Sequence, residues 1–321
     1  MENNIIKLNS VYKDYIWGGT KIRDFLRKDT GNMTCIAESW EISTHAAGMS
    51  TIAEGQYTGK TLSEYFDIVG WDKLGKYGEK YHRLPILVKY IDAKENLSIQ
   101  VHPDDSYANA HENDSGKNEM WYIVGAEKGA FIYLGFNRDV TKEEIIQRIA
   151  DNKLEEVLNR IPVKKGEAYY IPAGTVHAIG KGCLICEIQQ TSNVTYRLYD
   201  YDRKDKNGCP RELHIEKAVD VLNLSAFDVS SYTARDLNRF GRYFKKMLNK
   251  NASCSVIKYE ANGDFNYVLS DKSVAFVVVF GGRGSIVCGT SARKVSKGDV
   301  FLLSETMIKV MGKCKLIIIN L

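Results

Sequence analysis

Short hydrophobic runs with the pattern of β-strands dominate the chain. Each run is rich in Val, Ile, Tyr or Trp and is bounded by Gly, Pro or Asp, which is typical of strands. In the first two thirds of the chain we expect strands within residues 37–43, 84–91, 120–125, 130–136, 167–174 and 183–190. The pattern returns near residue 245, with strands expected within residues 255–260, 274–280, 284–289, 299–304 and 315–321. Many short strands separated by turn signals predict a mainly β protein built from sandwiches or small barrels.

Three segments have the apolar spacing of helices and lie between the expected strands. Residues 61–70 open with a Thr and, three positions later, a Glu, which is the pair that forms a capping box. Residues 141–161 open in the same way, and their Ile, Leu and Val residues recur at helical spacing. Residues 211–222 are the third candidate. We therefore expect helices as inserts in the β fold.

The chain has 321 residues, more than a typical single domain, and this length allows two. We place the boundary between residues 225 and 245. Residues 1–235 are assigned to a metal-binding domain with helical inserts, and residues 236–321 to a C-terminal β domain without metal ligands. The histidines support this division, because none of the six follows His214. A metal site that uses histidine must therefore be built by the first domain.

Composition and charge narrow the classes of protein. The chain is 44% hydrophobic and 26% charged, with a net charge of +4 and no basic run, so a nucleic-acid partner is not expected. No apolar stretch approaches the ~20 residues that a membrane span needs, and the first ten residues lack the apolar core of a secretory signal. The seven cysteines are odd in number and scattered, so they predict no disulfide framework. A reduced, cytoplasmic protein is expected, and the sequence does not indicate its oligomeric state.

The segment LSIQVHPDD, residues 97–105, places polar side chains on one face of a strand. Ser98, Gln100 and His102 alternate with apolar residues and therefore point the same way in an extended chain. Pro103 then ends the strand, because it has no N–H to donate. A Gln and a His side by side before a strand breaker are candidates for a binding site.

Two further segments offer metal-binding side chains. Glu119 stands at the head of an apolar strand, where burial of a lone carboxylate is costly, and His177 follows a Pro-Ala-Gly turn. Neighbouring strands lie ~4.8 Å apart, so residues on one face can converge on one ion. Together with Gln100 and His102 these ligands suit Zn²⁺, with Fe²⁺, Mn²⁺ or Co²⁺ also possible. Taken singly, His102 could be a hydrogen-bonded core histidine, Glu119 an ion-pair partner of Lys117, and His177 a residue that bonds a turn.

The same segments resemble a known family. SIQVHPD, KNEMWYIV, YIPAGTVHAIG and NVTYR together resemble the type I mannose-6-phosphate isomerases of the cupin superfamily, and YIWGG and AESWEIS resemble N-terminal blocks of its short bacterial branch. The resemblance covers nearly all of the first 210 residues in matching order. It implies two cupin-type β-barrels, or jelly rolls, with a helical insert. It also implies one Zn²⁺ per chain, held by Gln100, His102, Glu119 and His177.

The resemblance further implies a reaction and the residues that perform it. Members of the family interconvert mannose 6-phosphate and fructose 6-phosphate by proton transfer through an enediol or enediolate. The catalytic arginine of the family falls on Arg197, while Lys117 and Glu187 are the two candidates for the base. Ser98, Lys117 and Arg197 are expected to bind the sugar phosphate. Trp17 is expected either to form a wall of the pocket or to be a core residue.

One departure from the longer branch of the family concerns Arg203. The longer branch has a lysine six positions after the catalytic arginine, where this chain has Arg203. Because a guanidinium stays protonated, Arg203 is not assigned as a base. If residues 195–203 were extended, Arg197 and Arg203 would share one face. The alternative for this run is an edge strand on which Arg203 forms ion pairs with Asp200 and Asp202.

Two other functions are compatible with such a fold. An Fe²⁺-dependent cupin oxygenase would use His102, Glu119 and His177 as its ligands. A non-catalytic sugar-binding regulator would keep the pocket without the chemistry. Gln100 and the SIQVHPD segment favour the isomerase over the oxygenase, and Lys117 and Arg197 favour it over the regulator.

Overall fold

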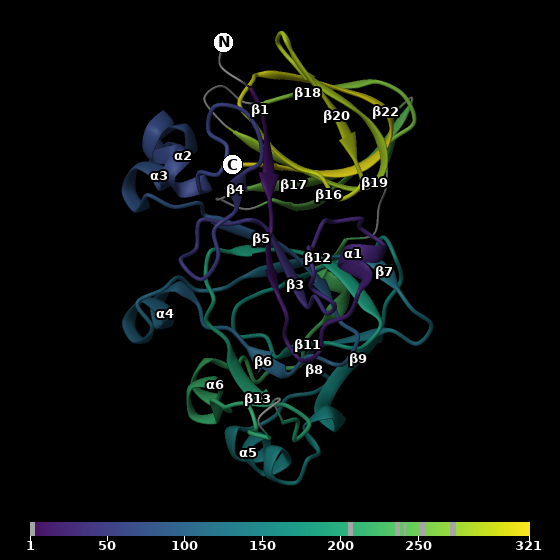
Figure 1. Cartoon of the computed structure of the whole chain (residues 1–321). Coiled ribbons are helices and arrows are strands. Elements are labelled where there is room, and N and C mark those ends of the chain that lie inside the picture. The colour runs from purple at the N-terminus through teal and green to yellow at the C-terminus, as the bar shows by residue number, and fades with distance from the viewer. Residues whose placement is uncertain (1–3, 205–207, 235–237, 241, 251–253, 270–273) are drawn as a thin grey trace.

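The computed structural model describes residues 4–204, 208–234, 238–240, 242–250, 254–269 and 274–321. Three β-sheets form most of its regular secondary structure, which confirms the expected mainly β fold (Figure 1). The predicted boundary between residues 235 and 236 lies outside the described residues. None of the helices in these ranges has the length and apolar content that crossing a membrane would need.

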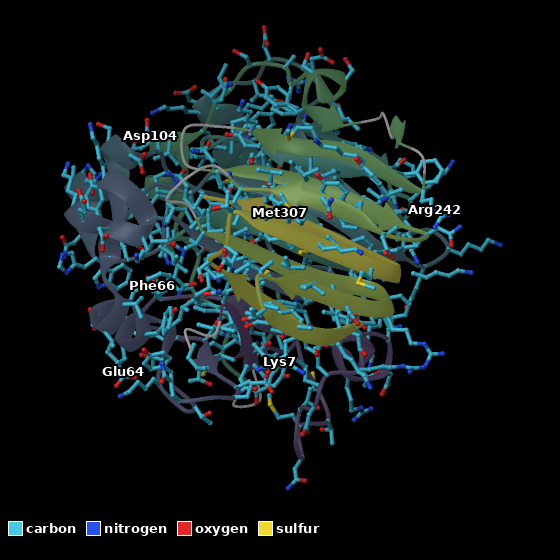
Figure 2. The ribbon with its side chains drawn as sticks, turned by 90° about the horizontal axis from the view of Figure 1, so that it is seen from above. Lys7, Glu64, Phe66, Asp104, Arg242 and Met307 are labelled. Carbon is cyan, nitrogen blue, oxygen red and sulfur yellow. The ribbon has the colours of Figure 1, made fainter. Side chains whose placement is uncertain are left out.

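The C-terminal strands build a ten-stranded sheet that curls around its own core (Figure 1). Seen from above, Met307 lies on the outer surface of this sheet (Figure 2). The first strand of the chain also joins it, because Ile5 pairs with Leu303 in an antiparallel ladder. The strands run in the order β15 (Asn238–Phe240), β16 (Tyr243–Lys250), β17 (Ser255–Ala261), β22 (Met307–Asn320), β19 (Ala275–Cys288), β21 (Val300–Leu303), β1 (Ile5–Asn9) and β4 (Thr51–Ile52), with β18 (Phe265–Val268) on β22 and β20 (Ser291–Ser296) on β19.

Two smaller sheets form the rest of the β structure and share a core. The seven-stranded sheet has the order β14 (Thr233–Ala234), β10 (Ala168–Ile171), β7 (Glu119–Ala126), β12 (Cys183–Gln190), β5 (Ile86–Asp92), β3 (Glu38–Ile42) and β2 (Val11–Lys13). The five-stranded sheet has the order β13 (Tyr196–Tyr199), β6 (Ile99–Val101), β11 (His177–Ile179), β8 (Phe131–Phe136) and β9 (Leu158–Pro162). All strand pairs in both sheets are antiparallel.

The seven-stranded sheet is buried on both faces, and the alternation of its side chains decides which face carries chemistry. On β7, Met120 and Tyr122 pack into the core shared with the C-terminal sheet, while Trp121 packs into the core shared with the five-stranded sheet. Because alternate residues face opposite ways, Glu119 shares the face of Trp121. On β12, Cys183 and Cys186 fall in different cores, because residues three apart in a strand face opposite ways.

The helices cover edges and outer faces of the sheets (Figure 1). α5 and α6 pack on the outer face of the five-stranded sheet, and α2 begins with the expected capping box between Thr61 and Glu64. The helices are α1 (Lys21–Asp24), α2 (Leu62–Val69), η1 (Trp71–Leu74), α3 (Gly75–Tyr81), α4 (Asp105–His111), α5 (Lys142–Ala150), η2 (Leu154–Val157), α6 (Ile215–Val221) and η3 (Val229–Tyr232).

The expected helix over residues 141–161 is split. α5 ends after nine residues, and Asn152 then takes a left-handed conformation with φ of 56°. A left-handed residue cannot continue a right-handed helix, so the chain passes through η2 into β9. Ile149 and Leu154 still pack in one core, which explains why the apolar spacing continued past the break.

Candidate active site

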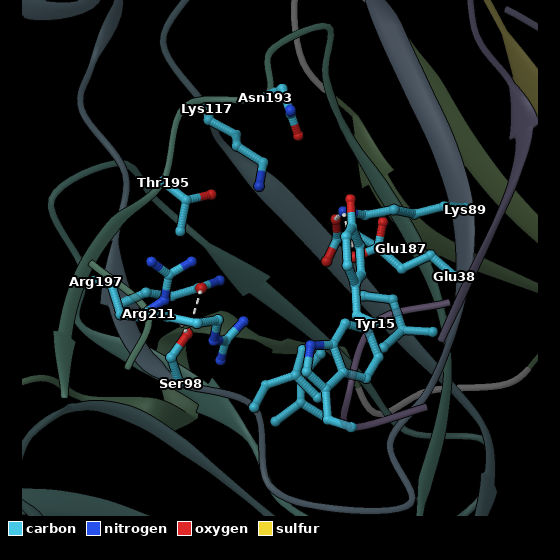
Figure 3. A pocket seen from close by; sticks show the side chains of 15 residues that line it. Tyr15, Glu38, Lys89, Ser98, Lys117, Glu187, Asn193, Thr195, Arg197 and Arg211 are labelled. Atoms are coloured by element: carbon cyan, nitrogen blue, oxygen red, sulfur yellow. Dashed lines mark hydrogen bonds and ion pairs between the residues drawn. The ribbon is translucent and has the colours of Figure 1, made fainter. Parts of the chain in front are cut away.

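A pocket of about 350 Å³ lies between the seven-stranded and five-stranded sheets (Figure 3). Polar and charged side chains from both sheets point into it. All five residues predicted for substrate binding and catalysis line this pocket, together with one predicted metal ligand: Trp17, Ser98, Lys117, Glu187 and Arg197, with Gln100. The other three predicted ligands, His102, Glu119 and His177, form a buried cluster beside it.

The three cluster residues come from strand ends on the two sheets. Their ligand atoms all lie within 4.8 Å of one another. His102 Nε2 is 3.0 Å from Glu119 Oε1, and His177 Nε2 is 3.8 Å from Glu119 Oε2. His177 and the neighbouring Gln100 are paired across β11 and β6, whereas Glu119 begins β7 in the facing sheet. The cluster therefore forms where the two sheets meet.

Hydrogen bonds fix which nitrogen of each histidine carries the proton. His102 Nδ1 lies 2.8 Å from the carbonyl oxygen of Val194, and His177 Nδ1 lies 2.8 Å from that of Thr175. Because a carbonyl oxygen only accepts, both Nδ1 atoms donate, and both Nε2 atoms carry a lone pair that faces the space beside the Glu119 carboxylate. Burial, aided by the charge of Lys117, lowers the pKa of His102 to about 3, and burial also lowers the pKa of His177. Both rings are thus neutral, the form that binds metals.

Lys117 brings a positive charge to the same donor atoms. Its Nζ lies 2.8 Å from Glu119 Oε1 and 3.2 Å from His102 Nε2. Burial alone would raise the pKa of Glu119, but the charge of Lys117 outweighs it and holds that pKa well below its usual value. The two imidazole lone pairs and the Glu119 carboxylate therefore converge on one place, and the Lys117 ammonium lies against these donor atoms. This donor set fits a divalent metal ion of the Zn²⁺ type.

Gln100 lies beside the cluster with its amide turned toward His177. Its Nε2 is 3.4 Å from His177 Nε2, and its Oε1 accepts a hydrogen bond from Ser98 Oγ at 3.3 Å. In this orientation the amide nitrogen, rather than the oxygen, is nearer to the cluster. Direct ligation by Gln100 therefore requires the amide to turn over and stays a prediction.

A row of alternating charges crosses the seven-stranded sheet next to the cluster. Glu187 on β12 is paired with Lys89 on β5 and with Trp121 on β7. Lys89 Nζ lies 3.1 Å from Glu187 Oε1 and 3.6 Å from Glu38 Oε1. Burial and the nearby charge of Glu119 raise the pKa of Glu187 to about 7. Burial alone would lower the pKa of Lys89, but the charges of Glu187 and Glu38 raise it.

Sequence reasoning missed Lys89 and Glu38, although both line the pocket. Lys89 interrupts an apolar run that is buried throughout β5, and alternation along that strand places it on the same face as Ile91. A lysine inside an otherwise apolar run was therefore the signal in the sequence. Because an unpartnered buried ammonium is costly, such a lysine indicates a buried carboxylate beside it.

Arginines occupy the opposite side of the pocket (Figure 3). Arg197 on β13 is paired with Gln100, its Nε donates to Ser98 Oγ at 3.3 Å, and its Nη1 donates to the carbonyl oxygen of Glu212 at 2.7 Å. Burial, together with the charge of Arg211, lowers the pKa of Arg197. Arg211 also lines the pocket and was missed in the sequence, because it lies beyond the strand in a loop without a motif.

The segment after Arg197 does not stay extended. β13 ends at Tyr199, and Tyr201 and Asp202 take left-handed conformations with φ of 57° and 49°. The expectation that Arg197 and Arg203 share one face was therefore wrong. Arg203 turns back onto the Asp200 carboxylate, which is one of the two ion pairs that the alternative interpretation predicted.

Trp17 satisfies both of its predicted roles. Its side chain is buried in the core between the two sheets, and its ring also lines the pocket. The ring of Tyr15 lies 5.7 Å away, centroid to centroid, and lines the same side. This side of the pocket is therefore aromatic, whereas the arginine side is positively charged.

The chain is similar along most of its length to known mannose-6-phosphate isomerases. The model of the type I phosphomannose isomerase catalytic domain matches residues 5–131. The mannose-6-phosphate isomerase ManA of Bacillus subtilis is 39% identical over 91% of this chain and 90% of its own length. The mannose-6-phosphate isomerase of Streptococcus mutans is 37% identical over 94% of this chain and 92% of its own. The crystal structure of the mannose 6-phosphate isomerase from Bacillus subtilis superposes with a TM-score of 0.89 at 35% identity, covering 99% of this chain and 100% of that one.

Proposed function

Because the chain belongs to the type I phosphomannose isomerases, we propose that its pocket binds a hexose 6-phosphate beside the metal cluster and isomerises it there. The protein is a metal-dependent aldose–ketose isomerase that interconverts mannose 6-phosphate and fructose 6-phosphate. The observation that carries the assignment of residues is the His102–Glu119–His177 cluster at the edge of a pocket lined by Lys117 and Arg197. The family relation favours this function over the cupin oxygenase and the sugar-binding regulator.

We propose that Gln100, His102, Glu119 and His177 hold one Zn²⁺ per chain. The support is the inward direction of both Nε2 lone pairs and the adjacent carboxylate. When bound, the ion supplies a Lewis acid that polarises substrate oxygens and needs no redox change. Because Lys117 Nζ competes for the same lone pairs, we expect it to turn toward the pocket in the metal-bound enzyme.

We propose Glu187 as the group that carries the proton between the two substrate carbons. Its carboxylate accepts the proton from carbon 2 of the aldose, leaving an enediolate, and returns it to carbon 1. The hydroxyl proton passes from the oxygen on carbon 2 to the oxygen on carbon 1, and together these two transfers give the ketose. A pKa of about 7 suits both halves of this transfer, since neither accepting nor returning the proton is strongly uphill. Lys117 stays the alternative base, because it also lines the pocket and touches the cluster.

We propose that the arginine side of the pocket holds the phosphate group. Arg197 and Ser98, already hydrogen-bonded to one another, offer a charged donor and a hydroxyl. Arg211 adds a second guanidinium, which Asp200 holds by two hydrogen bonds of 2.7 and 2.5 Å. Trp17 forms the apolar wall along which the sugar lies.

The test of this function is a coupled assay for fructose 6-phosphate formed from mannose 6-phosphate. We expect turnover by the purified protein, loss of turnover after chelation, and recovery on addition of Zn²⁺. His177→Ala should lose bound metal and activity together. Full activity in a metal-free His177→Ala protein would end the metal-site proposal, and oxygen uptake without isomerisation would favour the oxygenase.

We also infer that residues 1–235 form the metal-binding part and residues 236–321 a β part without metal ligands. In support, every proposed ligand and catalytic residue lies between Trp17 and Arg211. A cytoplasmic location and the lack of a nucleic-acid partner stay predictions from composition and charge.

A further inference from the structure

Trp121 touches two acidic groups that the proposed mechanism uses separately. Its indole Nε1–H lies 3.0 Å from Glu119 Oε2 and 2.9 Å from Glu187 Oε2, so one donor is shared by two carboxylates. The side chain is buried, and the edge of its ring meets His177 with centroids 5.4 Å apart and planes at 77°. We propose that Trp121 is a positioning residue that orients the metal ligand Glu119 and the proton carrier Glu187 relative to each other.

The shared donor has a direct electrostatic purpose. Two carboxylates that approach one another in a buried place repel, and the charge of Glu119 accordingly raises the pKa of Glu187. The positive edge of an N–H placed between the two oxygens reduces that repulsion without adding a mobile charge. It also leaves Glu119 Oε1 directed at His102, 3.0 Å away, and Glu187 Oε1 directed at Lys89, 3.1 Å away.

The sheet explains why the donor stays in place. Trp121 is paired with Glu187 across β7 and β12, and Glu119 lies two residues earlier on the same face of β7. The indole thus sits between a cross-strand neighbour and a same-strand neighbour. Its ring packs among apolar residues of the core between the two sheets, which fixes its rotamer. Glu119, the proposed metal ligand, and Glu187, the proposed proton carrier, are in this way both hydrogen-bonded to one rigid side chain.

The same sheet supplies a matched control. Trp40 on β3 lies opposite Lys89, at the other end of the charged row, and its Nε1 donates to Glu38 Oε2 at 2.7 Å. Trp40 is as buried as Trp121, but among the described residues its indole N–H bonds no member of the metal cluster. Removing either indole N–H therefore takes a hydrogen-bond donor away from a buried carboxylate. Removal at Trp121 affects the proposed metal ligand Glu119, whereas removal at Trp40 affects Glu38.

The experiment measures metal affinity first, without the reaction. In Trp121→Phe we expect the dissociation constant for Zn²⁺, from competition with a chromogenic chelator, to rise about 10–100-fold, as for other partners that orient metal ligands. Trp40→Phe should leave that constant unchanged. Because Phe also removes ring volume, a second variant carries benzothienylalanine at position 121, which keeps the two fused rings and replaces the N–H by sulfur. It should reproduce the weakened affinity while folding normally.

The second readout is the split between kcat and KM at saturating Zn²⁺. This arm rests on the proposed function, whereas the affinity arm does not, so the two can fail independently. We expect the benzothienylalanine variant to lose about tenfold or more in kcat with KM nearly unchanged, because Glu187 is displaced rather than the phosphate site. Zn²⁺ affinity and kcat both equal to wild type in that variant would overturn the proposal and leave Trp121 a packing residue. Weakened affinity with normal kcat would restrict its role to the metal ligand.

Discussion

At the scale of single residues, the pocket separates charge into two sides. Lys89 lies between Glu38 and Glu187 on one side, and Arg197 and Arg211 lie on the other (Figure 3). A hexose 6-phosphate has the same polarity, with a reacting carbonyl at one end and a dianionic phosphate at the other. In the proposed function, this arrangement of charge would orient the substrate before any chemistry begins.

Arg211 and Arg203 give a matched pair for testing the phosphate site, because both bind Asp200 and only Arg211 lines the pocket. Arg211→Gln should raise KM for mannose 6-phosphate roughly 10–100-fold, since a hydrogen bond to a charged group is worth about 1.5–3 kcal/mol. Arg203→Gln should change it less than about threefold. Steady-state kinetics and inhibition by inorganic phosphate measure both. Equal effects in the two variants would mean that Arg211 only supports Asp200.

Asp200 predicts a pH-dependent contribution to stability. Burial alone would raise its pKa, but hydrogen bonds from Arg211 and Arg203 outweigh it, so the pKa in the folded state is lowered. A lowered carboxyl pKa stabilises the fold above the unfolded value of about 3.9, and this contribution is lost as the pH falls through the folded value. Asp200→Asn should therefore be less stable than wild type at neutral pH, with a gap that closes below about pH 4. Urea unfolding across this range checks it, and a gap independent of pH would contradict it.

At the scale of elements, local signals predicted where α2 and α5 begin, whereas α6 begins at Ile215, inside the expected range of residues 211–222. The capping box of α2 is present in full: Thr61 Oγ1 accepts from the Glu64 backbone N–H at 3.2 Å, and the Glu64 carboxylate accepts from the Thr61 N–H at 2.7 Å. Where helices end was less predictable. The left-handed conformation of Asn152 divides residues 141–161 into α5 and the segment that follows it. No Gly or Pro lies in this part of the sequence to mark the end of the helix before β9.

The capping box of α2 can be tested by substitution. Thr61→Ala removes the side-chain acceptor from the first turn and should lower the free energy of unfolding by about 1 kcal/mol. Metal content and kcat should stay the same, because no residue of α2 lines the pocket. Thr61→Ser, which keeps the hydroxyl, is the control and should retain most of the stability. Equal losses in both variants would show that the methyl group, and not the cap, contributes.

At the scale of the whole molecule, the two ends of the chain depend on one another. β1 extends the ten-stranded sheet between β21 and β4, and Ile5 is fully buried in the core of that sheet. The sheet of the C-terminal strands is thus completed by the first strand of the chain. The β part therefore depends on residues far outside its own stretch of sequence.

This dependence predicts a remote effect on stability. Ile5→Ala opens a cavity in the core of the ten-stranded sheet and should lower the free energy of unfolding by about 2–5 kcal/mol. Amide hydrogen exchange should rise in β21, about 300 positions away in sequence, because Ile5 pairs with Leu303. Lys7→Ala on the same strand removes a partly exposed ion pair with Asp299 and should cost at most about 1 kcal/mol. Unchanged exchange in β21 would contradict the dependence.

The sequence by itself predicted most of the strands and the caps of two helices, although the two strands expected over residues 274–280 and 284–289 are one strand, β19. Alternation along a strand and a cap at a helix start involve neighbours a few positions apart. The shared face of Ser98, Gln100 and His102 could therefore be predicted from the sequence alone. The motifs around these residues also identified the family. Such features need no knowledge of which strand lies next to which.

Only the tertiary structure decided which distant strands meet. It brought Lys89 and Glu38 beside Glu187, placed Arg211 on the pocket, set Trp121 between two carboxylates and joined β1 to the C-terminal sheet. The physical reason is that a strand's period fixes its faces but not its partners. Partners are chosen by the burial of whole faces, which outweighs the slowly growing entropy of closing long loops.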